Sequence, residues 1–429
     1  MKDKIRTLII GSGGREYALA RAIAASPNCA ELFIHPHNDA ITRYAKPLPS
    51  NNDIIQQAQK NNISLVAIGP EQPLVDGLAD KFREANIPVF GPDANAARIE
   101  GSKITMKQLA DKANIPTARW RAAATPAEAH SILNKHGAPV VIKTDGLAAG
   151  KGVTVARDKK TAEAAIHSAM TEKRFGAAGE RIILEETLDG EELSCFALLD
   201  GNGGVMPFAS ARDWKRASAR PDSDNTGGMA SLSPAPGITR DEENEILARF
   251  IRPVDETLRR EGSPFRGILF AGLMRTREGL RLLEYNIRFG DPETQAILPR
   301  LESDLLELLR LCAAGSLNEA PPPRFSADLC FHLVLAARGY PREYQTDTVI
   351  KGLAALEKER EQTDGAGEEV RIVHAATRRD GGEWRAAGGR VLGLSARAPD
   401  LATARTRIRG ALARLDWPEG FHREDLLRD

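Results

Sequence analysis

Short apolar runs alternate with helical stretches over the first hundred residues of the chain. The apolar runs, which are typical of buried strands, are residues 5–10, 31–34, 65–68 and 88–90. The helical stretches between them are residues 17–25, 56–60 and 74–85. This alternation predicts an α/β domain with a parallel sheet and helices on both faces. Ligands of such sheets bind at the carboxyl ends of the strands, which here lead into loops 11–15, 36–40 and 69–72.

The pattern changes after residue 101. A helix is predicted over 102–121, followed by a smaller unit with helices at 126–135 and 160–170 and strands at 139–143, 153–156 and 181–186. The next part mixes strands at 193–199, 268–275 and 280–286 with helices at 241–260 and 292–311. Consecutive prolines at 321–323 favour an extended linker. The tail beyond it ends in a predicted helix over 402–415.

Composition narrows the class of protein. The 429 residues carry 59 basic and 59 acidic side chains, so net charge gives no reason to expect a nucleic acid or a membrane surface as partner. No apolar run approaches the ~18 residues of a membrane span. The charged N-terminus lacks the pattern of a signal peptide, and the four cysteines form no C-x-x-C pair. We therefore expect a multidomain cytoplasmic protein with buried free thiols. Nothing in the sequence distinguishes a monomer from a dimer.

The first glycine-rich loop, residues 11–16, follows a strand and opens a helix. Free backbone N–H groups at such a position favour an anion. A dinucleotide fingerprint would need glycine where Glu16 stands, which excludes a nicotinamide site of that type. The loop therefore either binds the phosphate of a smaller ligand, through Gly13, Gly14 and Arg15, or forms a tight turn without a ligand.

A second glycine-rich loop spans residues 145–153, between two short strands. It is no Walker A loop, because Gly152 follows Lys151 where serine or threonine would be required. With Lys143 on the strand before it, the loop could fold over a polyphosphate and offer its N–H groups as an anion cradle. The alternative is a plain β-hairpin.

One strand carries three polar side chains in alternation. Glu284, Asn286 and Arg288 are expected on one face of the strand, with Leu283 and Tyr285 on the other. Carboxylate and amide oxygens suit Mg²⁺ carried by a nucleotide, and an arginine could neutralise a transferred phosphoryl group. The alternative is the solvated face of an edge strand.

An acidic stretch at 185–192 is a weaker candidate. Backbone groups at Glu186 and Leu188 could hold an adenine and the Glu192 carboxylate could hold ribose hydroxyls, but an ordinary acidic turn has the same composition.

Taken together, these motifs resemble the phosphoribosylamine–glycine ligase family of the ATP-grasp superfamily. The matching segments cover nearly the whole chain, and the longest are Val-Ile-Lys-Thr-Asp-Gly-Leu-Ala-Ala-Gly-Lys-Gly-Val at 141–153 and Arg-Phe-Gly-Asp-Pro-Glu-Thr-Gln at 288–295. Others are Gly-Gly-Arg-Glu at 13–16, Glu-Gly-Ser-Lys at 100–103, Asn-Thr-Gly-Gly-Met at 225–229 and Gly-Gly-Arg-Val-Leu at 388–392.

The resemblance implies an ATP-grasp fold with five segments. These are an N-terminal Rossmann-like substrate domain (1–101), a linking first part of the ATP-grasp unit (102–125), a lid subdomain (126–190), a catalytic subdomain (191–323) and a small C-terminal α+β domain (324–429). The implied reaction is an ATP-dependent ligation of glycine to 5-phosphoribosylamine through an acyl phosphate, a step of purine synthesis. Small-molecule substrates and ATP with Mg²⁺ or Mn²⁺ are therefore expected.

The resemblance also assigns roles to individual residues. Nucleotide binding falls to Lys103, Lys143, Gly150, Lys151, Gly152, Glu185, Glu186, Leu188 and Glu192, and the metal falls to Glu284 and Asn286. Substrate binding falls to Gly13, Gly14, Arg15, Asn38, Asn225, Thr226, Gly227, Gly228, Arg288 and Asp291. The residues implied in catalysis are Arg288, Lys143, Asp213 and Lys215.

The chain departs from the family pattern on the amine side. Tyr17 and Trp214 stand where the family has histidine, and His37 and Ala40 stand where it has glycine, with Asp39 replacing a small residue. If these side chains line one pocket, they narrow it. Two alternatives follow: a paralogue with the same chemistry and another amine, or, more remotely, a non-catalytic ATP-binding regulator.

Overall fold

The computed structural model describes residues 4–49, 53–148, 151–220, 223–361 and 370–428. The N-terminal domain has the predicted parallel sheet, in the order β3-β2-β1-β4-β5. Its strands are β1 (Ile5–Ile10), β2 (Cys29–His35), β3 (Lys46–Pro47), β4 (Leu65–Ile68) and β5 (Val89–Phe90). Its helices are α1 (Gly14–Ala24), α2 (Ile54–Lys60), α3 (Glu71–Val75), α4 (Leu78–Glu84) and α5 (Ala94–Gly101). The prediction of a parallel α/β domain is confirmed.

Two predicted helices are shorter than expected. The helix expected over 74–85 is divided into α3 and α4 at Gly77, whose φ of +77° is a left-handed conformation that glycine adopts without strain. The helix expected over 102–121 is α6 (Lys103–Lys112), which ends before Asn114, another residue with positive φ, and Pro116. Residues 120–123 are instead a strand that the sequence analysis missed.

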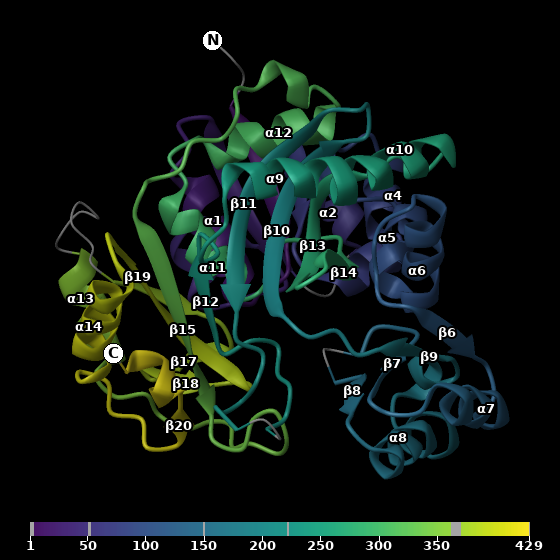
Figure 1. The fold of residues 1–429 in the computed structure, drawn as a ribbon. Helices are drawn as coiled ribbons and strands as arrows, with labels where there is room; N and C mark the ends of the chain where they lie inside the picture. The colour runs from purple at the N-terminus through teal and green to yellow at the C-terminus, as the bar shows by residue number, and fades with distance from the viewer. Residues whose placement is uncertain (1–3, 50–52, 149–150, 221–222, 362–369, 429) are drawn as a thin grey trace.

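A four-stranded antiparallel sheet follows, in the order β6-β9-β7-β8. Its strands are β6 (Trp120–Ala123), β7 (Val140–Thr144), β8 (Val153–Ala156) and β9 (Ile182–Glu186). With α7 (Pro126–His136) and α8 (Lys159–Ile166) it encloses a separate small core. Figure 1 shows this unit set apart from the rest of the molecule and joined to it near β6 and β9.

Nine of the remaining strands form one sheet, in the order β14-β13-β10-β11-β12-β15-β19-β16, with β20 beside β15. They are β10 (Glu191–Asp200), β11 (Val205–Asp213), β12 (Ala230–Ser233), β13 (Arg266–Thr276), β14 (Gly279–Asn286), β15 (Leu329–Ala337), β16 (Arg371–His374), β19 (Arg390–Ala398) and β20 (Gly420–Phe421). Strands β11 and β12 were not predicted from the sequence. The boundary predicted at residue 323 divides the chain but not this sheet, because β12 pairs with β15.

Helices cover this sheet and complete the C-terminal domain. They are α9 (Arg240–Ile246), α10 (Arg252–Arg260), α11 (Glu293–Ile297), α12 (Leu305–Ala314), α13 (Leu353–Glu361) and α14 (Leu401–Leu412), and a hairpin of β17 (Thr377–Asp380) and β18 (Glu383–Ala386) lies beside them. The helix expected over 292–311 is interrupted at Pro299, and it resumes where the Asp304 carboxylate caps α12 by accepting from the Leu306 N–H at 3.0 Å. Among the described helices, none has both the length and the apolar character needed to cross a membrane.

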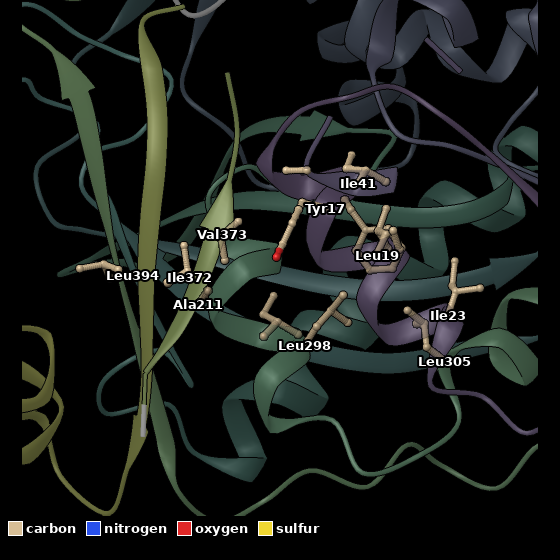
Figure 2. Packing of buried hydrophobic residues seen from close by; sticks show 14 of the residues in the cluster. Tyr17, Leu19, Ile23, Ile41, Ala211, Leu298, Leu305, Ile372, Val373 and Leu394 are labelled. Atoms are coloured by element: carbon tan, nitrogen blue, oxygen red, sulfur yellow. The ribbon is translucent and has the colours of Figure 1, made fainter. Parts of the chain in front are cut away.

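The N-terminal and C-terminal domains share a hydrophobic core. Figure 2 shows Tyr17, Leu19 and Ile23 of α1 facing a cluster that includes Leu298, Ile372 and Val373. Tyr17 is only 2% exposed, and its ring contacts the rings of Tyr44 and His374 at centroid distances of 5.6 and 5.5 Å. Helix α1 is therefore fixed between the two domains.

Candidate functional site

The predicted nucleotide and metal residues meet where the four-stranded sheet approaches β14. Lys103 of α6 lies 2.6 Å from the Glu284 carboxylate of β14. Lys143 of β7 donates a long hydrogen bond to the Leu283 carbonyl at 3.4 Å. Three elements that are distant in sequence, α6, β7 and β14, thus bring these side chains to one place, as the ATP-grasp resemblance implies.

A β-bulge sets the orientation of the acidic strand. The pairing of β13 with β14 passes from Leu282 to Glu284 and leaves Leu283 without a partner in the register. Leu282 and Tyr285 are therefore the buried core residues, and Leu283 is not in the core. The expected alternation, with Leu283 and Tyr285 on one apolar face, is wrong at this point, because a bulge reverses the face on which later side chains lie.

Glu284 and Asn286 fit a divalent cation carried by a nucleotide. Lys103 holds the pKa of Glu284 far below its usual range, so this carboxylate is ionised although it is partly buried. The Asn286 amide oxygen has only a marginal contact with Arg288, at 3.5 Å. Within the described ranges, no group of three histidine, cysteine, aspartate or glutamate side chains could hold a metal by itself. Phosphate oxygens and water would have to complete the coordination.

Glu185 lies between two lysines rather than open to a ligand. Its carboxylate is 2.8 Å from Lys143 and 3.0 Å from Lys107, and its side chain is 3% exposed. Burial alone would raise its pKa, but Lys143 and Lys107 lower it below the usual value. The neighbouring Glu186 accepts from the backbone N–H of Arg119 at 2.9 Å, at the end of β9 where the adenine hinge is expected.

Glu192, Asp213 and Lys215 lie near enough to Glu284 to interact with it electrostatically. Lys215 forms a 3.0 Å ion pair with Glu192, the residue expected to bind ribose. Burial raises the pKa of Asp213 to about 7, against the lowering effect of Lys215. A carboxyl group with this pKa can exchange a proton near neutral pH.

Arg288 is fixed by two acidic residues from the N-terminal domain side. Its guanidinium lies 3.1 Å from Glu71 and 3.1 Å from Glu100, and Glu100 is 5% exposed. No role was predicted from the sequence for either glutamate, although Glu100 lies in the matching segment 100–103 and Glu71 lies in the loop 69–72 at a strand end.

The first glycine loop is held by its own glutamate. The Glu16 carboxylate accepts from the Gly13 N–H at 2.7 Å and lies 2.6 Å from Arg15. Arg15 also donates to the Phe289 carbonyl at 3.1 Å, next to Arg288. The Gly13 N–H group therefore already donates to Glu16. An anion bound at the start of α1 would need hydrogen-bond donors other than this N–H group.

Asn38 connects three segments and uses all its hydrogen-bonding capacity. Its amide donates to the carbonyls of Ser12 and Ala375 at 2.6 and 3.2 Å, and its oxygen accepts from the N–H groups of Ala40 and Ile41. Because no donor or acceptor is left, Asn38 can position the loop but has no spare hydrogen bond for a substrate.

Asp39 is turned toward protein partners. It lies 2.7 Å from His37 and accepts from the Arg379 N–H at 2.7 Å. Burial would raise its pKa, but the Arg379 N–H and His37 lower it. Tyr17 is buried in the shared core, and Trp214 packs against the same core with its ring edge-on to Phe331. Tyr17, His37, Asp39 and Trp214 therefore do not line one pocket.

Tyr17→His should lower stability without changing substrate preference. Histidine is smaller and more polar, so the core would lose roughly 2 kcal/mol of unfolding free energy. Denaturant unfolding measures this loss, and kcat/KM for the amine should stay within twofold of the wild type. A tenfold change in kcat/KM at wild-type stability would contradict this prediction and indicate that Tyr17 lines the amine pocket.

The 225–228 turn is held by residues of the C-terminal domain. Arg390 donates to the carbonyls of Gly227 and Asp291 at 2.7 and 2.8 Å, and its guanidinium lies 3.1 Å from the Asp291 carboxylate. The Tyr340 hydroxyl accepts from the Gly227 N–H at 3.1 Å. Gly228 has φ of +111°, and a Cβ there would lie 2.3 Å from Pro292. Arg390 lies in the matching segment 388–392, but no role was predicted from the sequence for Arg390 or for Tyr340.

Other predicted residues have fewer contacts. Thr226 accepts from the Gly228 N–H at 3.0 Å and donates to the Lys215 carbonyl, which joins the turn to Lys215. Lys151 and Gly152 lead into β8, and Gly150 lies outside the described residues. Gly14 approaches the Gln295 amide so closely that a Cβ would lie 2.8 Å from it.

Comparison with known proteins gives matches along the whole chain. Family models described as the N, ATP-grasp (A) and C domains of phosphoribosylglycinamide synthetase match residues 5–100, 101–294 and 330–427. The chain is 42% identical over 427 residues to a phosphoribosylamine–glycine ligase of Phenylobacterium zucineum, with 98% of each chain covered. It is 44% identical over 426 residues to a protein of the same name in Mesorhizobium japonicum, covering 98% of this chain and 97% of that one.

Solved structures agree. The phosphoribosylamine–glycine ligase of Thermotoga maritima has a TM-score of 0.84 at 29% identity, covering 98% of this chain and all of that one. A Campylobacter jejuni biotin carboxylase has a TM-score of 0.74 at 16% identity, covering 99% and 94% of the two chains, which indicates a shared fold.

Proposed function

The chain belongs to the phosphoribosylamine–glycine ligase family, and from this premise we propose that it joins glycine to 5-phosphoribosylamine with ATP, giving glycinamide ribonucleotide, ADP and phosphate. It is an ATP-dependent ligase that forms a C–N bond. The observation that supports the proposal most strongly is the cluster around Glu284, where an ionised carboxylate, an amide oxygen and two lysines meet.

In the first step a glycine carboxylate oxygen attacks the γ-phosphorus of ATP and ADP leaves, which gives an acyl phosphate. Lys103, Lys143 and Arg288 would offset negative charge on the phosphoryl oxygens, since catalysis of this transfer is mainly positioning and electrostatics. Mg²⁺ or Mn²⁺, held by Glu284 and Asn286, would neutralise further phosphate charge. The 225–228 turn, fixed by Arg390, would hold the glycine.

In the second step the amine nitrogen attacks the acyl carbon and phosphate leaves. The nitrogen must lose a proton as the amide forms, and Asp213, with its pKa raised to about 7 by burial, is suited to accept it. The first glycine loop, with Gly14 and Arg15, would hold the 5-phosphate of the amine.

The test is release of ADP by the purified protein with Mg²⁺–ATP, glycine and phosphoribosylamine generated in situ. We expect ADP release to require both glycine and the amine, and omission of either to reduce it to background. A panel of other amines is run in parallel. Faster turnover with another amine would favour the paralogue, in which His37 and Asp39 serve a different substrate. No ADP release with any amine would contradict ligase activity.

A further inference from the structure

Lys107 is a fully buried lysine to which the sequence motifs assign no role. It lies on α6, its side chain is 0% exposed, and its ammonium donates to the Thr117 hydroxyl at 2.6 Å. Thr117 in turn donates to the Leu282 carbonyl of β14 at 2.7 Å. Burying an ammonium group costs free energy unless the group is paired with an acidic one. The acidic partner of Lys107 is therefore the next group to consider.

That partner is Glu185, which Lys107 shares with Lys143. The two ammonium groups contact different oxygens of the carboxylate, at 3.0 and 2.8 Å. Lys143 also reaches the Leu283 carbonyl, one residue beyond the carbonyl that Thr117 contacts. These contacts close a ring that joins the four-stranded sheet, through β7 and β9, to α6 and β14. The ring lies where the nucleotide is expected to bind.

The charges in this ring add to plus one. Because Lys107 neutralises the Glu185 carboxylate, the positive charge of Lys143 stays available to a bound anion. Without Lys107, the carboxylate would be paired with Lys143 alone and would compete with phosphate for that ammonium. We propose that Lys107 is a positioning residue for nucleotide binding, which holds Glu185 so that Lys143 can engage phosphate. This inference rests on the proposed function, because it requires a nucleotide at Lys143.

The surroundings of Lys107 make its charge dependent on pH. Burial, together with Lys143 and Lys103, lowers its pKa to about 8, against the raising effect of Glu185. The charged groups that face it are therefore Glu185 on β9, Lys143 on β7 and Lys103 on its own helix. Below this pH the Lys107 ammonium neutralises Glu185. Above it the Lys107 amine is uncharged, and Lys143 becomes the cation paired with the Glu185 carboxylate.

The experiment measures the Kd of Mg²⁺–ADP by calorimetry, without glycine or amine, at pH 7 and pH 9.5. Lys107→Met should bind ADP about tenfold more weakly than the wild type at pH 7, the lower end of the roughly 10- to 100-fold loss typical for groups that orient a ligand from behind. At pH 9.5 the two proteins should agree within about twofold, because the wild-type amine is then neutral too. The matched control is Lys112→Met, at an exposed lysine on the same helix that pairs with Glu261, and it should match the wild type at both pH values.

Equal weakening of Lys107→Met at both pH values would indicate a purely structural role and overturn the inference. If that variant does not fold, the wild type decides: its ADP affinity must fall as pH rises through about 8, and a flat profile overturns the inference. A wild type that binds no ADP at all would contradict the proposed function, and with it this inference.

Discussion

Glu284→Gln should lower kcat by about 10²-fold or more, the scale of losing one charge-stabilising group at a reacting centre. Glutamine has nearly the same shape, so β14 and its bulge should be retained. The change removes the anion that Lys103 keeps ionised at 2.6 Å, and with it the charged ligand expected for the divalent cation. Lys103 would then lack its carboxylate partner as well.

The measurement is ADP release at saturating ATP over a range of Mg²⁺ concentrations, where the variant should need more Mg²⁺ for half-maximal turnover. Glu278→Gln is the control, because Glu278 lies in the turn before the same strand, is largely exposed and pairs with Arg281 at 3.0 Å. Its turnover should equal that of the wild type. Unchanged turnover and Mg²⁺ dependence in Glu284→Gln would exclude Glu284 from the metal site.

Local patterns were sufficient for most of the fold. Strands β1 and β4 were predicted from the apolar runs at 5–10 and 65–68. A strand of a parallel sheet is buried on both faces, so its sequence is an almost continuous apolar run that is easy to recognise. Strands β11 and β12 were missed because β11 contains Pro207 and ends in polar residues, and β12 has only four residues. Their position depends on pairing with β10 and β15, which are far away in sequence.

Residues of the candidate site could be predicted where they lie in a sequence motif. Residues whose role depends on a tertiary contact could not be predicted. Motif segments contain Lys143, Glu284 and Arg288, but no local pattern shows that Glu185 is shared with Lys107 or that Arg390 holds the 225–228 turn. The same limit applies to Tyr17. Its difference from the family histidine is visible in the sequence, whereas its burial against His374, more than 350 residues away, comes from the tertiary structure.

Arg288→Lys should lower kcat by about 10²-fold while the protein stays folded. The guanidinium contacts Glu71 through Nε and Glu100 through a terminal nitrogen, both at 3.1 Å, and this fork geometry fixes where the remaining N–H groups lie. An ammonium is a single point charge and cannot reproduce both contacts. The charge survives in the variant but its placement beside the transferred phosphoryl group is lost, so kcat should fall more than the KM for ATP changes.

A second substitution separates this loss from a loss of stability. Arg288→Gln removes the charge and leaves Glu100 buried without its cation, which should cost about 3 kcal/mol of unfolding free energy, measured by denaturant titration. Arg281→Lys is the matched control, since Arg281 lies on the same strand and pairs with the exposed Glu278. It should leave both kcat and stability unchanged. If Arg288→Lys retained wild-type kcat, Arg288 would only brace the two glutamates, and the charge at the phosphoryl group would have to come from Lys103 and Lys143.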